Sequence, residues 1–285
     1  MHNLLQNARI SALLAIASAV TIGAGTAVQA AGFEILAPHR AVYDLKLKQA
    51  SDRSGIEAMT GRIVYELTGN ECDGLSVRYR FVTTIATSSE SYRTDQQTAT
   101  FESPDGREFT FLTKSLVDDR LESTVKGRAV RKEAGTSVDL AQPEARQLEL
   151  EPSVFISTHL VDVITAALKG ESMVRRDIFD GSDGADEVVS SSTFIGEAKA
   201  VGATFDGESP EAVARIDNRE AWPVTVSYFD KTVGATAESI PLYEASFLLY
   251  PNGISRRLIM RYPDYSLEGE LTSLEMLERQ PCAKN

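Results

Sequence analysis

Short stretches in which apolar and polar residues alternate recur along most of the chain, and this feature constrains its fold most. In residues 41–48, apolar Tyr43, Leu45 and Leu47 are separated by charged residues, which is the period of a strand with one buried face. The pattern therefore predicts a mainly β protein. The other candidate strands are residues 61–68, 75–87, 96–103, 107–117, 120–132, 145–150, 191–201, 221–230, 242–250, 255–263 and 265–277.

Tight turns join several of these candidate strands. Residues 103–106 read Ser-Pro-Asp-Gly, with proline and glycine where turn dihedrals favour them. Residues 250–254 contain Asn252-Gly253, a pair that tolerates the positive φ of a hairpin turn. Consecutive strands joined in this way form an antiparallel meander, so we expect one extended, strongly curved antiparallel sheet.

Residues 152–170 break the strand pattern and predict one helix packed on the sheet. This stretch has no proline or glycine between its ends and closes on Gly170, a residue that commonly follows a helix C-terminus. Helical spacing places a set of apolar side chains on one face. The set is Phe155 or Ile156, Leu160, Val163, Ile164, Ala167 and Leu168.

The N-terminus has the pattern of a secretory signal peptide over residues 1–30. One cation, Arg9, precedes an apolar run from Ile10 to about Val20, and Val28 and Ala30 suit the −3 and −1 positions of a cleavage site. An uncleaved membrane anchor is the alternative, but the run is short and no basic stop-transfer cluster follows it. We therefore expect cleavage after Ala30, a location outside the cytoplasm, and no membrane span after cleavage.

Cys72 and Cys282 are the only two cysteines. In an oxidising compartment they can form one intramolecular bridge, which would tie the C-terminal strand to an early one and close the curved sheet. Closing a loop of about 210 residues would restrict the unfolded chain by roughly 5 kcal/mol. Two free buried thiols are a second possibility. A redox pair is a third, although redox cysteines are usually close in sequence.

The composition is that of a globular, acidic protein. The chain is 42% hydrophobic and carries 29 Lys and Arg against 41 Asp and Glu, a formal net charge of −12. Residues 31–285 are enough for one large domain or two small ones. The negative charge repels nucleic acid at long range, so no nucleic-acid partner is expected.

Residues with catalytic or metal-binding chemistry are scarce. Beyond residues 1–30, the histidines are His39 and His159, far apart and without a second ligand at metal spacing. We interpret His159 as a helix residue in a polar or partly buried setting. The sequence contains no nucleophile elbow, phosphate loop or zinc-protease motif, so we expect no cofactor, no metal and no enzymatic activity.

Two charged clusters remain. Residues 180–187 resemble a calcium loop in composition, but Gly184 and Ala185 stand where ligands and the loop glycine belong, so an acidic turn is favoured over a cation site. A basic cluster, formed by Lys126, Arg128, Arg131 and Lys132, fits a solvated strand face better than an anion-binding patch.

Several segments, in order, are similar to the EipB-like family of periplasmic cell-envelope integrity proteins of alphaproteobacteria. They are LAPHRAVYDLKL, GRIVYELTGNECDG, TDQQTATFESPDG, IFDGSDGADEV, LYEASFLLYPNGISRRLIMRYPDYSLEGELTSLEML and the late cysteine. The resemblance implies a single domain over residues 31–285: a curved antiparallel β-spiral, or half-open barrel, with one packed helix. It also implies a Cys72–Cys282 disulfide and a non-enzymatic role in envelope integrity, and it offers no catalytic residues.

Two functional hypotheses follow. The favoured one is a binding or scaffolding module whose curved sheet holds a periplasmic or envelope protein or a lipid-like ligand. The alternative is a hydrolase of envelope polymers that uses a carboxylate pair without a recognisable motif. The absence of a nucleophile or metal motif favours the first.

Overall fold

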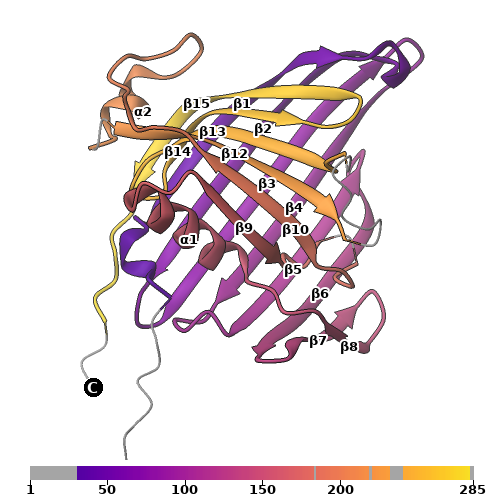
Figure 1. Cartoon of the computed structure of the whole chain (residues 1–285). Coiled ribbons are helices and arrows are strands. Elements are labelled where there is room, and N and C mark those ends of the chain that lie inside the picture. The colour runs from indigo at the N-terminus through magenta and orange to yellow at the C-terminus, as the bar shows by residue number, and fades with distance from the viewer. Residues whose placement is uncertain (1–30, 183, 218–219, 232–239, 283–285) are drawn as a thin grey trace, which may run out of the picture.

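The computed structural model describes residues 31–182, 184–217, 220–231 and 240–282 (Figure 1). The signal peptide predicted over residues 1–30 lies outside the described residues and stays a prediction. Within the described part, fifteen strands form one antiparallel sheet that does not close on itself. The prediction of a curved antiparallel sheet is confirmed.

The first eight strands follow one another in the sheet as a meander. Each strand pairs with its predecessor in antiparallel register, as the turn signals in the sequence indicate. The strands are β1 (His39–Ala50), β2 (Ile56–Asn70), β3 (Gly74–Thr87), β4 (Ser91–Glu102), β5 (Glu108–Val117), β6 (Arg120–Lys132), β7 (Gly135–Gln142) and β8 (Arg146–Leu150).

The later strands extend the same sheet from the other side of β1. Strand β15 pairs with β1, so the first and last strands are neighbours, and β8 and β9 form the two edges. The small strand β11 pairs only with β12. These strands are β9 (Met173–Ile178), β10 (Val189–Ile195), β11 (Lys199–Ala200), β12 (Glu220–Asp230), β13 (Tyr243–Leu249), β14 (Ser255–Arg261) and β15 (Tyr265–Met276).

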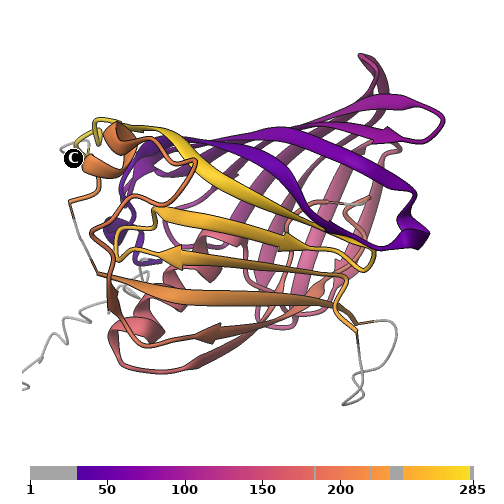
Figure 2. The same ribbon diagram turned by 90° about the horizontal axis from the view of Figure 1, so that it is seen from above.

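The sheet coils so that its two halves face each other. Figures 1 and 2 show β9 to β15, coloured from dark rose through orange to yellow, opposite the purple and magenta strands of the first half. Helix α1 (Ile156–Leu168) lies at one end between these walls, because its buried residues share a cluster with Leu67 and Leu75 of one wall and Val224 and Val226 of the other.

Helix α1 is shorter than the predicted 152–170 and uses a different set of buried residues. Val163, Ile164 and Ala167 are buried as expected, but Ile156 is 41% exposed and Leu168 is 62% exposed. At the start of the predicted face, Phe155 is fully buried in place of Ile156. The predicted apolar face was therefore wrong at Leu168, the last residue of the helix.

Three short elements were not predicted, and one predicted strand is divided. Strands β7 and β9 have few large apolar residues, and α2 (Pro210–Ala214) is a single turn with Ser209 as its N-cap. The candidate strand 191–201 is interrupted between β10 and β11, where Gly196 donates to the Pro223 carbonyl. Two 3-10 turns, Phe33–Ile35 and Asp52–Ser54, flank β1.

Both predicted turns are confirmed. The Gly106 N–H donates to the Ser103 carbonyl at 2.8 Å, and the Gly253 N–H donates to the Tyr250 carbonyl at 3.0 Å. Gly106 and Gly253 have φ values of +63° and +87°, a region that side chains with a Cβ rarely adopt.

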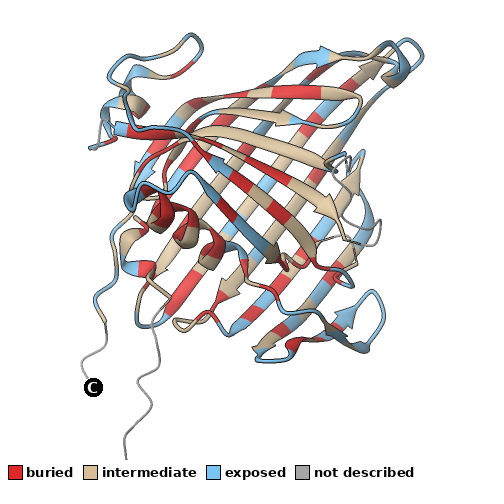
Figure 3. Ribbon diagram, in the orientation of Figure 1, coloured by how far each residue is buried: buried red, intermediate tan, exposed pale blue. Residues whose placement is uncertain are grey.

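The core is divided among three apolar clusters. One surrounds α1, a second lies between β1, β15 and α2, and a third contains packed phenylalanines from β5 and from the segments before α1 and after β9. Figure 3 shows buried and exposed positions alternating along the strands. The alternation that predicted the strands is therefore the one that forms the core.

Candidate functional site

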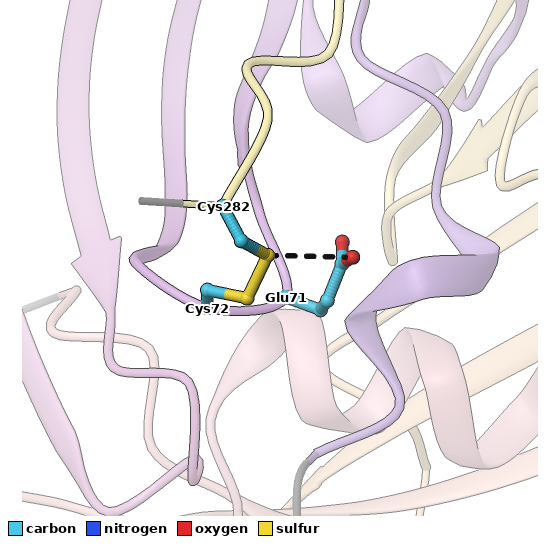
Figure 4. Close-up of side chains that lie close together, drawn as sticks. All are labelled: Glu71, Cys72 and Cys282. Atoms are coloured by element: carbon cyan, nitrogen blue, oxygen red, sulfur yellow. Dashed lines mark hydrogen bonds between the residues drawn. A yellow bond between two sulfur atoms is a disulfide. The ribbon is translucent and has the colours of Figure 1, made fainter. Parts of the chain in front are cut away.

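The disulfide joins two segments that are far apart in sequence. Cys72, in the β2–β3 turn, is bonded to Cys282, beyond β15, with their Cα atoms 5.6 Å apart (Figure 4). Arg279 forms an ion pair with Glu71 at 3.0 Å, and Asn70 donates to the Gln280 carbonyl at 3.2 Å. These contacts hold the tail against the hairpin.

The bridge does not close the sheet, contrary to our expectation. Strand β15 is already paired with β1, and the sheet edges are β8 and β9, whereas the bridge joins the tail to the turn after β2. Among the described residues, Glu71, Cys72 and Cys282 form the only close group of three potential metal ligands. Because the two sulfurs are bonded to each other, they are not thiolate ligands.

Both described histidines are buried rather than placed at an open site. The His39 Nδ1 lies 2.7 Å from the Ala37 carbonyl oxygen, and burial lowers the pKa of its ring. The His159 Nε2 lies 3.3 Å from the Thr193 hydroxyl. Burial lowers the pKa of His159 to about 4, so this side chain is neutral at physiological pH and is more buried than expected.

Sequence reasoning missed a buried carboxylate, Glu102, at the start of α1. It is 1% exposed and accepts hydrogen bonds from the Ser157 and Thr158 N–H groups at 2.9 and 3.2 Å and from the Thr158 hydroxyl. The carboxylate thus caps the helix from strand β4. Burial raises its pKa, although these donors act in the opposite direction.

A buried ion pair was missed as well. Arg256 is fully buried and Glu208 is 7% exposed. The Arg256 Nε donates to Glu208 Oε1 at 3.0 Å, and its terminal nitrogens contact Glu208 Oε2, the Tyr250 hydroxyl and the Ala203 carbonyl. The pair fastens the segment before α2 to β14, which makes its role structural.

The inner face of the sheet is rich in half-buried aromatic side chains. Tyr43 of β1 is buried on the inner face, and Ala41, two residues before it, points to the same face. Ala41 pairs with Tyr65 of β2, and Tyr65 pairs with Tyr79 of β3, so both tyrosines also lie on the inner face. These rings pack against the core clusters without being sealed by them. The half-buried inner aromatics are Tyr65, Tyr79, Phe81, Tyr92, Tyr228, Tyr243, Phe247, Tyr262 and Tyr265.

Four of these tyrosines form a stacked row. Ring centroids are 4.4 Å apart for Tyr228 and Tyr243, 5.8 Å for Tyr243 and Tyr262, and 4.7 Å for Tyr262 and Tyr265. Burial raises the pKa of Tyr228 and of Tyr262 to about 12. The row therefore offers neutral, largely apolar surface, together with the aromatic rings of β3.

The two charged clusters of the sequence have ordinary contacts in most positions. In the acidic turn, Asp180 accepts from the Ser182 N–H at 2.9 Å and Asp186 pairs with Arg146 at 2.9 Å. Residue 183 lies outside the described residues. In the basic cluster, Arg131 donates to the Gly106 carbonyl.

The other three cations of the basic cluster differ in whether they form an ion pair. Lys132 pairs with Glu149 at 3.4 Å and Arg128 with Glu108 at 2.7 Å. Lys126 has no ion pair with a described residue. Lys126 and Arg128 line a groove on the outer face of the sheet.

An open, coiled antiparallel sheet with one packed helix defines a β-barrel-like protein. The fold is similar to the crystal structure of a β-barrel-like protein of a domain of unknown function from Brucella abortus, with a TM-score of 0.79 and 36% identity, covering 85% of this chain and 99% of that one. None of the helices in the described residues is long and apolar enough to span a bilayer.

The chain belongs to the EipB-like family, whose model matches residues 30–278. It is 36% identical over 275 residues to the cell envelope integrity protein EipB of Brucella abortus (strain 2308), covering 95% of this chain and 96% of that protein. The family resemblance drawn from the quoted sequence segments is confirmed.

Proposed function

We propose that the protein is a non-enzymatic periplasmic protein that supports cell-envelope integrity by holding a lipid-like envelope partner on the inner face of its sheet. The envelope role is supported by the family and by the name of the relative from Brucella abortus. The periplasmic location rests on the signal-peptide pattern of residues 1–30.

The observation that carries the binding proposal is the lining of half-buried aromatic rings inside the coiled sheet. Partly exposed apolar surface of this kind is costly in water, and its rings offer contacts to an apolar ligand. Acyl chains match such a surface because they bury apolar area without requiring directed hydrogen bonds.

The chemistry of the buried polar groups agrees with a binding role. The Glu102 carboxyl group accepts a hydrogen bond from the N-terminus of α1, and the Glu208 carboxylate forms an ion pair with Arg256. His159 is desolvated, with its pKa near 4, which suits neither a general acid nor a general base at neutral pH. These groups maintain the walls and helix around the aromatic lining.

Native mass spectrometry of the protein purified from its host periplasm tests the proposal. The wild type should retain lipid-sized adducts, and Phe81→Ser, on the inner face, should lose them. Phe194 provides the control, because it is 55% exposed on the opposite phase of β10, and Phe194→Ser should retain the adducts. A wild type without adducts, or equal retention in both variants, would refute binding on the inner face.

A further inference from the structure

The outer face of the first half of the sheet, on the opposite side from the proposed lipid-binding face, contains a groove. Its larger part has a volume of about 760 Å³ and its smaller part about 520 Å³. Both parts are lined by Glu66, Arg78, Ala99 and Leu112, so they form one depression across strands β1 to β7. These strands run from purple to magenta in Figure 1.

Register shows how this groove is built. Arg78 of β3 pairs with Ala99 of β4, Ala99 pairs with Leu112 of β5, and Leu112 pairs with Lys126 of β6. The row therefore has a cation at each end and two small or apolar residues between them. Since the strands lie about 4.8 Å apart, the two cations stand on strands separated by roughly 14 Å.

The next row also has a cation at each end, with one polar residue between them. Arg80 of β3 pairs with Gln97 of β4, and Gln97 pairs with Lys114 of β5. The groove thus has one basic bank on β3 and another on β5 and β6, with a floor between them formed by the outward residues of β4 and Leu112. An extended chain with its side chains is about 10 Å thick and fits between such banks.

The cations of the two banks differ in their partners. Arg80 forms an ion pair with Asp95 at 2.7 Å, and Arg78 lies 3.6 Å from Glu66 while remaining 79% exposed. Lys114 and Lys126 are exposed, and neither forms an ion pair with a described residue. The carboxylates of Glu66 and Asp139 also line the groove, but neither forms an ion pair with Lys114 or Lys126, so the bank on β5 and β6 keeps two cations unpaired within the described part of the chain.

We propose that this groove binds an extended, acidic segment of a partner protein, laid along β4 and β5 between the two basic banks. The exposed cations of the groove supply local charge complementarity to an anion, in a chain whose formal net charge is −12. The recessed floor of Ala99 and Leu112 favours a peptide with apolar side chains among its acidic ones.

Fluorescence anisotropy with a labelled peptide of about ten residues, alternating glutamate and small apolar residues, tests the proposal; extended, it spans roughly 33 Å. The wild-type protein should bind it with an affinity that falls as salt rises. Lys114→Glu/Lys126→Glu should weaken binding by at least about tenfold, because it replaces attraction by repulsion in both rows.

Two further variants distinguish binding in the groove from an effect of the net charge of the protein. Arg175→Glu/Lys199→Glu makes the same change in net charge at exposed positions outside the groove and should keep the affinity within about twofold. Ala99→Trp fills the floor without changing charge and should weaken binding, while its melting temperature shows that the fold is retained.

Three results would overturn the proposal. The first is no binding of the peptide by the wild type. The second is an equal loss in the groove variant and in its charge-matched control, which would show that long-range charge alone is measured. The third is stronger binding to vesicles containing phosphatidylglycerol than to the peptide, which would assign the face to a membrane surface.

Discussion

The two helices are fastened to the sheet by buried carboxylates that are stabilised in opposite ways. At α1, Glu102 is a single carboxyl group held by N–H and O–H donors. At α2, Glu208 is held by the guanidinium of Arg256, with which it shares two contacts. The first arrangement uses dipoles and the second uses an opposite charge.

This difference determines which substitutions and which changes of pH each region tolerates. A carboxylate at a helix N-terminus can lose its charge and remain a hydrogen-bond acceptor, because its partners are neutral. A buried ion pair cannot lose one member without leaving the other charge desolvated. We therefore expect the α2 region to be sensitive to single substitutions and the α1 region to be sensitive to pH.

The largest effect is expected from Arg256→Met. It leaves Glu208 buried without its cation, which should lower the free energy of unfolding by about 3–5 kcal/mol in urea denaturation. The double variant Glu208→Leu/Arg256→Met removes both charges and should recover much of the loss. A loss below about 1 kcal/mol in the single variant would mean that water reaches Glu208 and that the comparison is wrong.

The disulfide stabilises a third region with its own partners, Asn70, Glu71 and Arg279. Cys72→Ser or Cys282→Ser should lower the free energy of unfolding by about 2–4 kcal/mol and leave the fold recognisable. Because the bridge and the ion pair are held by different residues, the losses should add in a combined variant.

Reduction of the wild type should reproduce the loss seen in the cysteine variants. Melting curves with and without reductant measure it, and reductant should leave Cys72→Ser unchanged. Two free thiols in the unfolded, unreduced wild type, or identical melting of the wild type in both conditions, would show that the bridge does not form in solution.

The sequence predicted most strands because one buried face imposes a period of two, and it predicted both main turns because their glycines need positive φ. The missed elements lack these signals: β9 contains Met173 and Arg175 on its exposed side, and α2 is too short for a helical period. The order of strands, with β15 beside β1, depends on long-range pairing that local patterns do not encode.

The buried charges were hidden for a related reason. In Phe101-Glu102 the sequence favours the hydrophobic residue on the inner face, yet Glu102 is the buried one, because α1 supplies its donors. In Arg256-Arg257, the sequence alone predicts that both charged side chains are exposed. Arg257 has a φ of +55°, and the register of β13 and β14 shifts opposite this point, so Arg256 points inward.

His159 should make the α1 region acid-sensitive. Its pKa is about 4 in the folded protein, against a usual value of 6.5, so between these pH values the unfolded chain binds a proton that the folded chain does not. Stability from this group is complete above pH 6.5 and falls as pH decreases, by about 2 kcal/mol at pH 5. Urea denaturation across this range measures the slope.

His159→Gln is the matched variant for this slope. Glutamine keeps a polar group near Thr193 and does not titrate, so the decline between pH 6.5 and 4 should be reduced by about the same 2 kcal/mol at pH 5. If wild type and His159→Gln lose stability in parallel, His159 is not the acid-sensitive group of α1.

The smallest effect is expected from Glu102→Gln. Because burial raises the pKa of Glu102 in the folded protein above its usual 4.5, the folded chain binds this proton more readily than the unfolded chain. Stability from this group is therefore fully present below the usual pKa and is lost as pH rises through the folded pKa. Glutamine is neutral and still accepts a hydrogen bond, so the variant should lie within about 1 kcal/mol of wild type at pH 7.

Glu102→Ala separates the charge from the hydrogen bonds. It leaves the Ser157 and Thr158 N–H groups without their acceptor, and a buried unsatisfied donor costs about 1–3 kcal/mol. The free energy of unfolding measured in urea should therefore be clearly lower for Glu102→Ala than for Glu102→Gln. If glutamine is as damaging as alanine, the negative charge itself holds α1, and Glu102 depends on its charge as Glu208 does.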